Sequence, residues 1–364
     1  MADIPWWLPE FGTRERSLVQ EVFDSNFVND GAVTTEFEQR MAERLGCPYA
    51  VATTSGTTAL FLALAGLDVG AGDEVIVPDV TFVASANAVT LTGATPVIVD
   101  VDPATLAIDP PAVRRALTPQ TRAIMPVHIS GRAAPMPEIL EIAREHDLVV
   151  VEDAAEALHS KRFGSFLGTQ GDAGCFSLSP NKTISSGQGG IVVTANEALH
   201  RRLRELKDQG RPVRGTGGAD EHVSVGFNFK LTNLQAAVAL GQLERLDDRI
   251  AAMTNNARIY LERLGGHPRL TFPGFDLDNG EVPQWVDVLC DDREALLDHL
   301  EQNSIDCRRF WHPLHRQAPY QASDGDFPVA TAQVPKAFWL PSGFNLTEDQ
   351  VRFVCDSIQD FLGA

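Results

Sequence analysis

Short apolar runs alternate with amphipathic stretches along the first half of the chain. The runs are rich in β-branched residues and cover 50–53, 74–77, 96–99, 123–126 and 148–151. Between them, apolar residues recur with a helical period over 58–67, 84–92, 111–117 and 138–146. Continuous apolar runs are typical of strands that are buried on both faces, and crossover helices connect such strands in parallel. The pattern therefore predicts an α/β fold with a mostly parallel central sheet.

Helix signals also precede this alternating region. A first helix is predicted from Thr13, and a second is predicted from Thr35. Glu38, three residues after Thr35, would complete a capping box with it, and Gly46 would end the helix.

The second half of the chain has a different texture. Strands are predicted over 190–194 and 285–289, and helical stretches over 197–208, 232–264, 293–302 and 348–361. Because few parallel-strand signals remain after about residue 266, we expect a smaller C-terminal α+β domain. The predicted division is a large α/β domain with an N-terminal arm over 1–250 and the smaller domain over 251–364.

Charge and cysteine content narrow the range of partners and compartments. The formal net charge of −19 disfavours nucleic acid and anionic membranes, although a small anionic substrate can still bind in a locally basic pocket. The five cysteines are scattered without a CxxC pair, which argues against a zinc site and a disulfide scaffold. We see no signal peptide and no apolar run long enough to cross a bilayer, so a cytoplasmic protein is expected.

Candidate chemistry follows the predicted strands. Ligands bind beyond the carboxyl ends of parallel strands, so the residues there are the first candidates. Ser55, Gly56 and Thr57 follow the first strand and open a helix; they form either a phosphate cradle or only a helix cap. Asp153 follows the fifth strand, where a carboxylate can face a pocket, cap a helix or pair with a surface base.

A single lysine, Lys182, follows another strand that ends near Ser177. Such a lysine is often a solvated surface residue, but small residues and glycines on both sides favour tight packing around a buried amine. A desolvated amine is available as a nucleophile and can carry a proton. Amine, carboxylate and phosphate cradle together suit pyridoxal 5'-phosphate (PLP), which needs a protonated ring nitrogen to act as an electron sink.

These segments together resemble the DegT/DnrJ/StrS-type sugar aminotransferases, which are fold-type-I PLP enzymes. The resemblance extends over nearly the whole chain, and the order and spacing of its motifs make it specific. The matching segments are 27–31, 55–60, 70–78, 93–97, 152–155, 177–182, 226–228 and 313–315.

The resemblance implies a role for each matching residue. Lys182 matches the lysine that forms an imine with PLP, and Asp153 matches the partner of the pyridine nitrogen. Phe82 matches the aromatic residue that stacks on the cofactor ring, although a core phenylalanine would be the ordinary interpretation. The phosphate contacts match Gly56, Thr57 and Ser177. Asn228 matches a residue that reaches the neighbouring subunit's site, so a homodimer with composite sites is implied.

The chain departs from the family pattern at three places. Glu156 stands where glutamine is usual, near the expected position of the cofactor's phenolic oxygen. Because a carboxylate beside a phenolate is a like-charge contact, Glu156 should either be protonated or point away. The segment 128–132 lacks the usual aromatic-glycine form, and Gln188 replaces a common acidic residue.

The implied activity is transfer of an amino group from an amino acid, expected to be L-glutamate, to a keto sugar attached to a nucleotide. The segment 309–315 is most similar to the perosamine-synthase group, which aminates carbon 4 of a 4-keto-6-deoxy sugar in the biosynthesis of amino sugars such as those of O-antigen lipopolysaccharide. His312 and His315 are candidate sugar contacts, with packing roles as the alternative.

Three other functions would each require a different sequence feature. A PLP-dependent sugar dehydratase would carry histidine in place of Lys182. A non-catalytic PLP-binding regulator would be expected to carry a basic DNA-binding module, which this sequence does not show. A nicotinamide-dependent oxidoreductase would need a GxGxxG turn after the first strand, which Ser55-Gly56-Thr57 does not supply.

Overall fold

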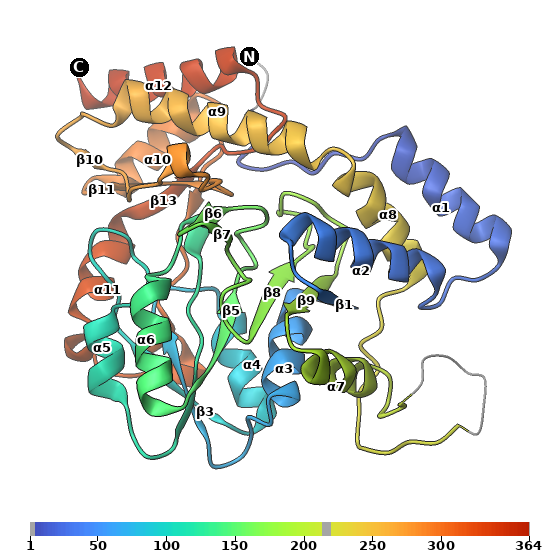
Figure 1. Ribbon diagram of the computed structural model, residues 1–364. Coiled ribbons are helices and arrows are strands. Elements are labelled where there is room, and N and C mark those ends of the chain that lie inside the picture. Colours follow the sequence, from blue (N-terminus) through green and yellow to red (C-terminus); the bar gives the residue numbers. More distant parts are fainter. Residues whose placement is uncertain (1–3, 213–219, 364) are drawn as a thin grey trace.

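The central feature of the fold is a seven-stranded sheet with helices on both faces (Figure 1). The computed structural model describes residues 4–212 and 220–363. The strand order is β1-β9-β8-β5-β4-β2-β3. Its strands are β1 (Tyr49–Thr53), β2 (Glu74–Pro78), β3 (Thr95–Val99), β4 (Thr121–Ile124), β5 (Val149–Asp153), β8 (Ala173–Ser177) and β9 (Gly190–Thr194). Only β9 runs antiparallel to its neighbours, so the predicted mostly parallel sheet is confirmed.

Alternate residues of each strand pack against different helices, which explains the continuous apolar runs. Val51, Val75 and Val151 face α3, α4 and α7. Ala52 and Val150 face the other layer, which contains α2, α5, α6 and α8. The bounds of these helices are α2 (Ala32–Leu45), α3 (Gly56–Gly66), α4 (Ala84–Thr92), α5 (Pro110–Ala116), α6 (Met136–His146), α7 (Glu197–Lys207) and α8 (Asn233–Leu243). The predicted helices between the strands are therefore confirmed.

The predicted start of the second helix is wrong. Helix α2 begins at Ala32 with Gly31 as its N-cap, so Thr35 lies inside the helix rather than at its cap. Glu38 accepts a hydrogen bond from the Ala52 N–H at 2.9 Å instead of forming a capping box. Gly46 does end the helix, in the left-handed conformation with φ of 60°.

The predicted long helix over 232–264 is two helices. Thr232 caps α8, which ends at Leu243, and α9 runs over Leu246–Leu264 after a break at Glu244 and Arg245. Figure 1 shows α8 beside α1 (Thr13–Ser25) and α9 passing into the C-terminal part of the molecule. The proposed domain boundary at residue 250 falls within α9.

The C-terminal part is built on an antiparallel sheet of order β10-β11-β13-β12. Ile4 forms a bridge with Ile305, so the N-terminal segment lies against this part. The elements here are β10 (Leu270–Thr271), β11 (Val286–Cys290), α10 (Arg293–Gln302), β12 (Arg308–Arg309), α11 (Pro328–Gln333), β13 (Ala337–Leu340) and α12 (Glu348–Leu362). A separate two-stranded hairpin, β6 (Lys161–Arg162) and β7 (Ser165–Phe166), lies between β5 and β8 in the chain. None of the helices in the described ranges is long and apolar enough to cross a membrane.

Candidate active site

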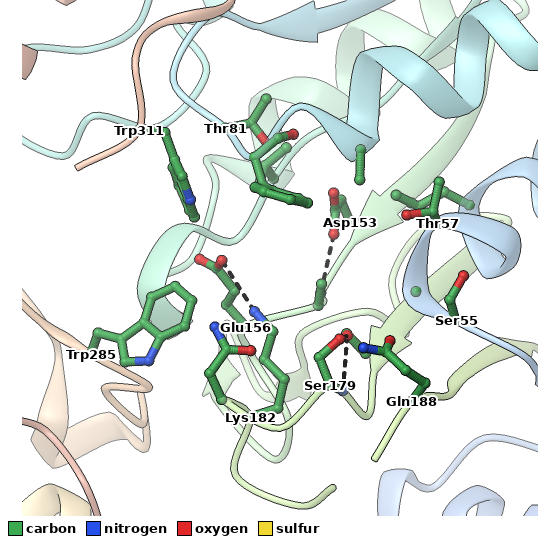
Figure 2. A pocket seen from close by; sticks show the side chains of 18 of the residues that line it. Ser55, Thr57, Thr81, Asp153, Glu156, Ser179, Lys182, Gln188, Trp285 and Trp311 are labelled. Atoms are coloured by element: carbon green, nitrogen blue, oxygen red, sulfur yellow. Dashed lines mark hydrogen bonds and ion pairs between the residues drawn. The ribbon is translucent and has the colours of Figure 1, made fainter. Parts of the chain in front are cut away.

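A cavity of about 330 Å³ lies at the carboxyl ends of the parallel strands. Its wall combines the residues that follow β1, β5 and β8 with Trp285, Arg308 and Trp311 from the C-terminal part. Figure 2 shows Ser55 and Thr57 on one side of the cavity and the two tryptophans on the opposite side, with Asp153, Glu156 and Lys182 between them. The cavity is therefore placed where parallel sheets bind ligands.

One end of the cavity has the features of a phosphate cradle. Gly56 and Thr57 begin α3, and the Ser55 hydroxyl accepts the Thr58 N–H at 3.1 Å. A Cβ on Gly56 would lie 2.9 Å from the Cβ of Ser177, so only glycine allows this close approach of β8 to the helix start. Hydroxyls and N–H groups at the start of an 11-residue helix form a good environment for a dianionic phosphate. Gln188 also lines the cavity.

Asp153 is the last residue of β5 and is only 5% exposed. Its carboxylate accepts the Ser85 hydroxyl at 2.7 Å and the Ala155 N–H at 3.1 Å. Burial raises the pKa of Asp153, and these bonds together with the charge of Lys182 offset only part of that effect. A carboxylate with unmet demand for positive charge, facing a cavity, suits a cationic N–H of a ligand.

Lys182 lies in the loop after β8, and its side chain is only 10% exposed. Its Nζ is 3.3 Å from Oε1 of Glu156 and 4.4 Å from the centre of the Trp285 ring. The amine is thus sheltered, as the flanking small residues predicted, and it faces the cavity (Figure 2).

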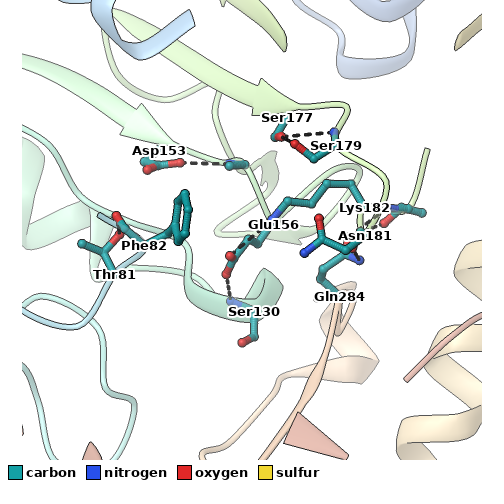
Figure 3. Close-up of polar contacts among 12 residues, drawn as sticks. Thr81, Phe82, Ser130, Asp153, Glu156, Ser177, Ser179, Asn181, Lys182 and Gln284 are labelled. Carbon is teal, nitrogen blue, oxygen red and sulfur yellow. Dashed lines mark hydrogen bonds and ion pairs between the residues drawn. The ribbon is translucent and has the colours of Figure 1, made fainter. Parts of the chain in front are cut away.

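The loop around Lys182 is held from the C-terminal part by Gln284. The Gln284 Oε1 accepts the Thr183 hydroxyl at 2.6 Å and the Thr183 N–H at 3.1 Å. Its Nε2 donates to the carbonyl of Asn181 at 3.2 Å (Figure 3). Both chain neighbours of Lys182 are therefore fixed by one buried side chain.

Glu156 points into the cavity, not away from it (Figures 2 and 3). Its Oε1 faces Lys182, and its Oε2 accepts the Ser130 N–H at 2.8 Å. Burial raises the pKa of Glu156, against the opposing effect of the Lys182 charge. The expectation was that Glu156 either points away from the cavity or is protonated. It does not point away, and the raised pKa favours the protonated carboxyl group.

The unusual segment around Ser130 joins Glu156 to a buried ion pair. Ser130 has a left-handed backbone with φ of 54°, and its hydroxyl donates to Asp287 at 2.6 Å. Asp287 also pairs with the buried Arg132 at 2.9 Å and accepts the Trp339 N–H at 2.8 Å. The residues that depart from the family's usual aromatic-glycine form thus build a polar support behind Glu156.

Aromatic rings line the side of the cavity that faces away from the cradle. Phe82 is 51% exposed although it lies in the cavity wall, and its ring centre is 6.2 Å from that of Trp311. A large apolar side chain left open in a cavity suits stacking on a planar ligand. The core interpretation of Phe82 is therefore not supported.

The structure does not bring every predicted residue into this cavity. Asn228 is exposed and forms a bridge with Asp208, away from the cavity wall. His312 is exposed and does not line the cavity. His315 is fully buried, with Nδ1 2.6 Å from Asp79 and Nε2 3.0 Å from Asp324, so it has the packing role that was the alternative.

Several residues of the site were not predicted from the sequence. No local pattern marks Ser130, Gln284 or Trp285, because their partners lie 26 to 157 residues away along the chain. The one available signal was the departure of the segment 128–132 from the family form.

The residues in the cavity fit PLP. The cradle suits its phosphate, Asp153 suits its ring nitrogen, and Lys182 is a sheltered amine in the same cavity. Because Gly56 has no side chain, its backbone lies close to Ser177 at the cradle; a Cβ there would collide with that of Ser177. Among the described residues, no group of three or more histidine, cysteine or acidic side chains is placed to hold a metal ion.

Comparison with known proteins agrees with this geometry. The model of the DegT/DnrJ/EryC1/StrS aminotransferase family matches residues 9–359. The chain is 39% identical to a GDP-perosamine synthase of Caulobacter vibrioides, with 97% of each chain covered, and 36% identical to one of Escherichia coli O157:H7, with 99% of each covered. The solved structure of S. venezuelae DesV in complex with a ketimine intermediate is 34% identical, covers 96% of this chain and 94% of its own, and has a TM-score of 0.91.

Fold and site together define a fold-type-I, PLP-dependent aminotransferase. The chain belongs to the DegT/DnrJ/EryC1/StrS aminotransferase family. The resemblance inferred from the sequence motifs is thereby confirmed.

Proposed function

We propose that this enzyme transfers an amino group from L-glutamate to carbon 4 of a nucleotide-linked 4-keto-6-deoxy sugar, in the biosynthesis of an amino sugar. The main support is the full-length likeness to two GDP-perosamine synthases. The likeness includes 97% and 99% of the chain, so it extends over the cavity and the C-terminal wall that would meet the sugar. A GDP-linked sugar is therefore the first acceptor to test.

The residues of the cavity would bind PLP in a defined orientation. Gly56, Thr57 and Ser177 would hold its phosphate, Phe82 would stack on its ring, and Asp153 would accept the ring N–H. When bound, PLP acts as an electron sink and carries the amino group between donor and acceptor. By keeping its negative charge next to the ring nitrogen, Asp153 would keep that nitrogen protonated.

Lys182 is the group we assign to proton transfer. Its Nζ, in the neutral form, would take a proton from the reacting carbon of the donor and return one to the acceptor. Trp285 covers this amine at 4.4 Å and keeps bulk water from it, while Glu156 at 3.3 Å offers a nearby site for the proton. Gln284 keeps the loop in place during both half-reactions, because it holds Asn181 and Thr183.

We further propose a homodimer with composite sites, in the cytoplasm. Asn228 is exposed in the single chain, and in the dimer it would reach the partner's cavity. All five cysteines are free, which supports a reducing compartment. No nucleic acid or membrane is proposed as a partner, given the net charge of −19.

The alternatives predict other behaviour. A sugar dehydratase would have histidine at position 182, whereas the chain has a lysine that faces the cavity. A PLP-binding regulator would retain the cofactor but show no turnover. Conversion of the bound cofactor by an amino donor is expected of an aminotransferase, but not of a sugar dehydratase or a PLP-binding regulator.

The test has two stages, one for each substrate. The PLP-loaded enzyme is mixed with L-glutamate, and loss of the absorbance of the lysine-bound cofactor is recorded; L-glutamine is the second donor. A GDP-linked and a dTDP-linked 4-keto-6-deoxy hexose are then supplied separately, and the product is identified by mass spectrometry and NMR. We expect return of the absorbance and an amino group at carbon 4. No spectral change with any donor would contradict transamination, and amination at carbon 3 would contradict the proposed position.

A further inference from the structure

Arg308 is a cation at the cavity that the proposed chemistry does not use. Besides Lys182, it is the only lysine or arginine among the described residues that line this cavity. No carboxylate of the described residues forms an ion pair with Arg308, in contrast to most arginines of this acidic chain. A guanidinium left without a counter-ion on a protein of net charge −19 is available for an anionic ligand.

Aromatic contacts hold the Arg308 guanidinium in place. It lies 4.8 Å from the centre of the Trp6 ring and 5.9 Å from that of Trp339. The backbone of Arg308 pairs with Trp339 across β12 and β13. Because the guanidinium stacks on indoles, its planar donors are preorganised and remain free to bind oxygen atoms.

The next residue along the strand shows the contrast. Arg309 alternates to the other side of β12, where its guanidinium forms hydrogen bonds with Glu294 at 2.5 and 2.9 Å. It does not line the cavity. The two neighbouring arginines thus have the same charge and a similar exposed position, but only Arg308 faces the cavity without a carboxylate.

The position of Arg308 relative to Lys182 selects the kind of anion. Lys182 lies over the Trp285 ring, and Trp285 contacts both Trp6 at 5.4 Å and Trp339 at 4.8 Å. Arg308 lies over those two further rings, so the two cations rest on different rings of one tryptophan cluster. An amino acid has its carboxylate one bond from the reacting carbon, so this anion would lie beside Lys182 and Trp285. The diphosphate of a nucleotide sugar is attached across the sugar ring from carbon 4, so it would lie farther from the reacting carbon and could reach a cation on another ring of the cluster.

We propose that Arg308 binds the diphosphate of the sugar nucleotide and so selects the acceptor over the amino donor. This inference rests on the proposed function, because it assumes a nucleotide-linked acceptor. One cavity would then hold two anion sites: the start of α3 for the cofactor phosphate, and the Arg308 guanidinium, stacked on tryptophan rings, for the acceptor.

The test measures binding of GDP and dTDP to the PLP-loaded enzyme by calorimetry, with the free nucleosides and L-glutamate as further ligands. Charge-assisted bonds from a guanidinium to phosphate predict that Arg308→Gln raises the dissociation constant of the diphosphate about 10- to 100-fold. Arg308→Lys keeps the charge but not the planar set of donors, so its dissociation constant should lie between those of the wild type and Arg308→Gln. Arg309→Gln is the matched control and should bind as the wild type does, and glutamate half-reaction rates should be the same in all variants.

Four other results would contradict the role of Arg308 or the nucleotide-linked acceptor. Equal diphosphate binding by wild type and Arg308→Gln would overturn the role of Arg308 and leave the proposed function standing. Equally weakened diphosphate binding in Arg308→Gln and Arg309→Gln would show that the effect comes from net charge alone. This result would also overturn the role of Arg308. A raised KM for glutamate with unchanged diphosphate binding would assign Arg308 to the donor carboxylate instead. Wild-type enzyme that binds neither diphosphate would overturn the nucleotide-linked acceptor itself.

Discussion

Two buried carboxylates that each face a lysine behave in opposite ways in this protein. Glu38 is 4% exposed and accepts hydrogen bonds from Lys207 at 3.0 Å, Arg204 at 2.9 Å and the Ala52 N–H at 2.9 Å. Burial alone would raise its pKa, but the charges of Lys207 and Arg204 outweigh burial and lower the pKa to about 2. Among the described residues, the Glu156 carboxylate contacts one cation, Lys182 at 3.3 Å, and accepts the Ser130 N–H, and burial raises its pKa.

The difference lies in how completely the chain satisfies each carboxylate. Glu38 has two cations and an amide, so the group is complete and fixes α2 against α7 and β1. Asp153 and Glu156 share one amine in a cavity, so their demand for positive charge is left for a ligand. Raised pKa values beside an open cavity are characteristic of functional sites, while a fully paired group is structural.

The largest effect is expected for Lys182→Ala. Without this amine no covalent attachment of PLP is possible, so we expect loss of turnover to background and no pyridoxyl label after borohydride reduction and peptide mapping. The control is Lys336→Ala, since Lys336 is a surface lysine paired with Asp291 at 2.8 Å. Full turnover by the Lys182 variant, or a label on another lysine, would rule out the assignment.

The next effect concerns stability, not activity. Glu38→Gln leaves the Arg204 guanidinium without its carboxylate partner and Lys207 with only Asp30, at 3.4 Å, among the described residues. The variant should lower the free energy of unfolding by about 3–5 kcal/mol at pH 7. Because the folded pKa of about 2 lies below the usual 4.5, the stabilisation is present above pH 4.5 and is lost as pH falls toward 2. Denaturant unfolding at pH 7 and pH 3 should therefore show a smaller difference between variant and wild type at pH 3.

The matched control for this measurement is on the same helix. Glu36 forms an exposed pair with Arg40 at 2.7 Å, and Glu36→Gln should change stability by less than about 1 kcal/mol. Similar losses for the two variants would show that Glu38 is no more than a surface charge.

The contrast between these groups also shows what sequence can predict. Lys182 and Asp153 were predictable because each lies at or shortly after the end of a strand, and the carboxyl ends of parallel strands meet at one edge of the sheet. Glu38 was misassigned to a capping box because its spacing from Thr35 fits that motif. Its true partner, Lys207, is 169 residues away in the chain, and a local pattern contains no information on such a pair.

The same limit applies to the C-terminal wall of the cavity. The periodicity predicted a strand from Trp285, and β11 begins one residue later, at Val286. It did not predict that Trp285 covers Lys182 or that Gln284 holds its loop. These contacts depend on how the C-terminal four-stranded sheet is placed relative to the loop that follows β8 of the seven-stranded sheet. His315 shows the opposite case. It lies within a family motif and was a candidate sugar contact, but its ring is buried and contacts Asp79.

Asp153→Asn should have a smaller effect than the two changes above. Loss of one charge-assisted bond predicts PLP binding about 10- to 100-fold weaker and slower proton abstraction. The stability of the cofactor-free protein should not fall, because burial of the Asp153 carboxylate is already unfavourable, as its raised pKa shows. Equilibrium binding of PLP and unfolding of the cofactor-free protein measure the two effects separately.

Glu152 provides the opposite control for Asp153. It is the preceding residue of β5, and its carboxylate accepts the N–H groups of Gly168 at 2.8 Å and of Gln170 and Gly171 at 2.6 Å. Glu152→Gln should lower stability without a direct effect on PLP affinity. Wild-type affinity and rates in Asp153→Asn would show that the ring nitrogen lies elsewhere.

The smallest effect is expected for Glu156→Gln, which tests whether this carboxylate acts on Lys182. Glutamine keeps an acceptor for the Ser130 N–H but removes the charge 3.3 Å from the lysine nitrogen. A negative charge at this distance favours the protonated nitrogen. The pH midpoint of the absorbance of the lysine-bound cofactor should therefore fall by about 1 unit in the variant.

The sign of this shift depends on the protonation of Glu156 itself. Burial raises its pKa above the usual 4.5, so at acid pH both enzymes carry a neutral group there and their spectra should coincide. The spectra should separate as pH rises through that raised pKa, since only the wild type then gains a charge. Ser130→Ala is the control: it keeps the backbone N–H to Glu156 but removes the hydroxyl bond to Asp287, so it should lower stability and leave the midpoint unchanged. Identical titrations of Glu156→Gln and wild type over pH 5 to 10 would mean that Glu156 is as inert toward Lys182 as the glutamine usual in the family.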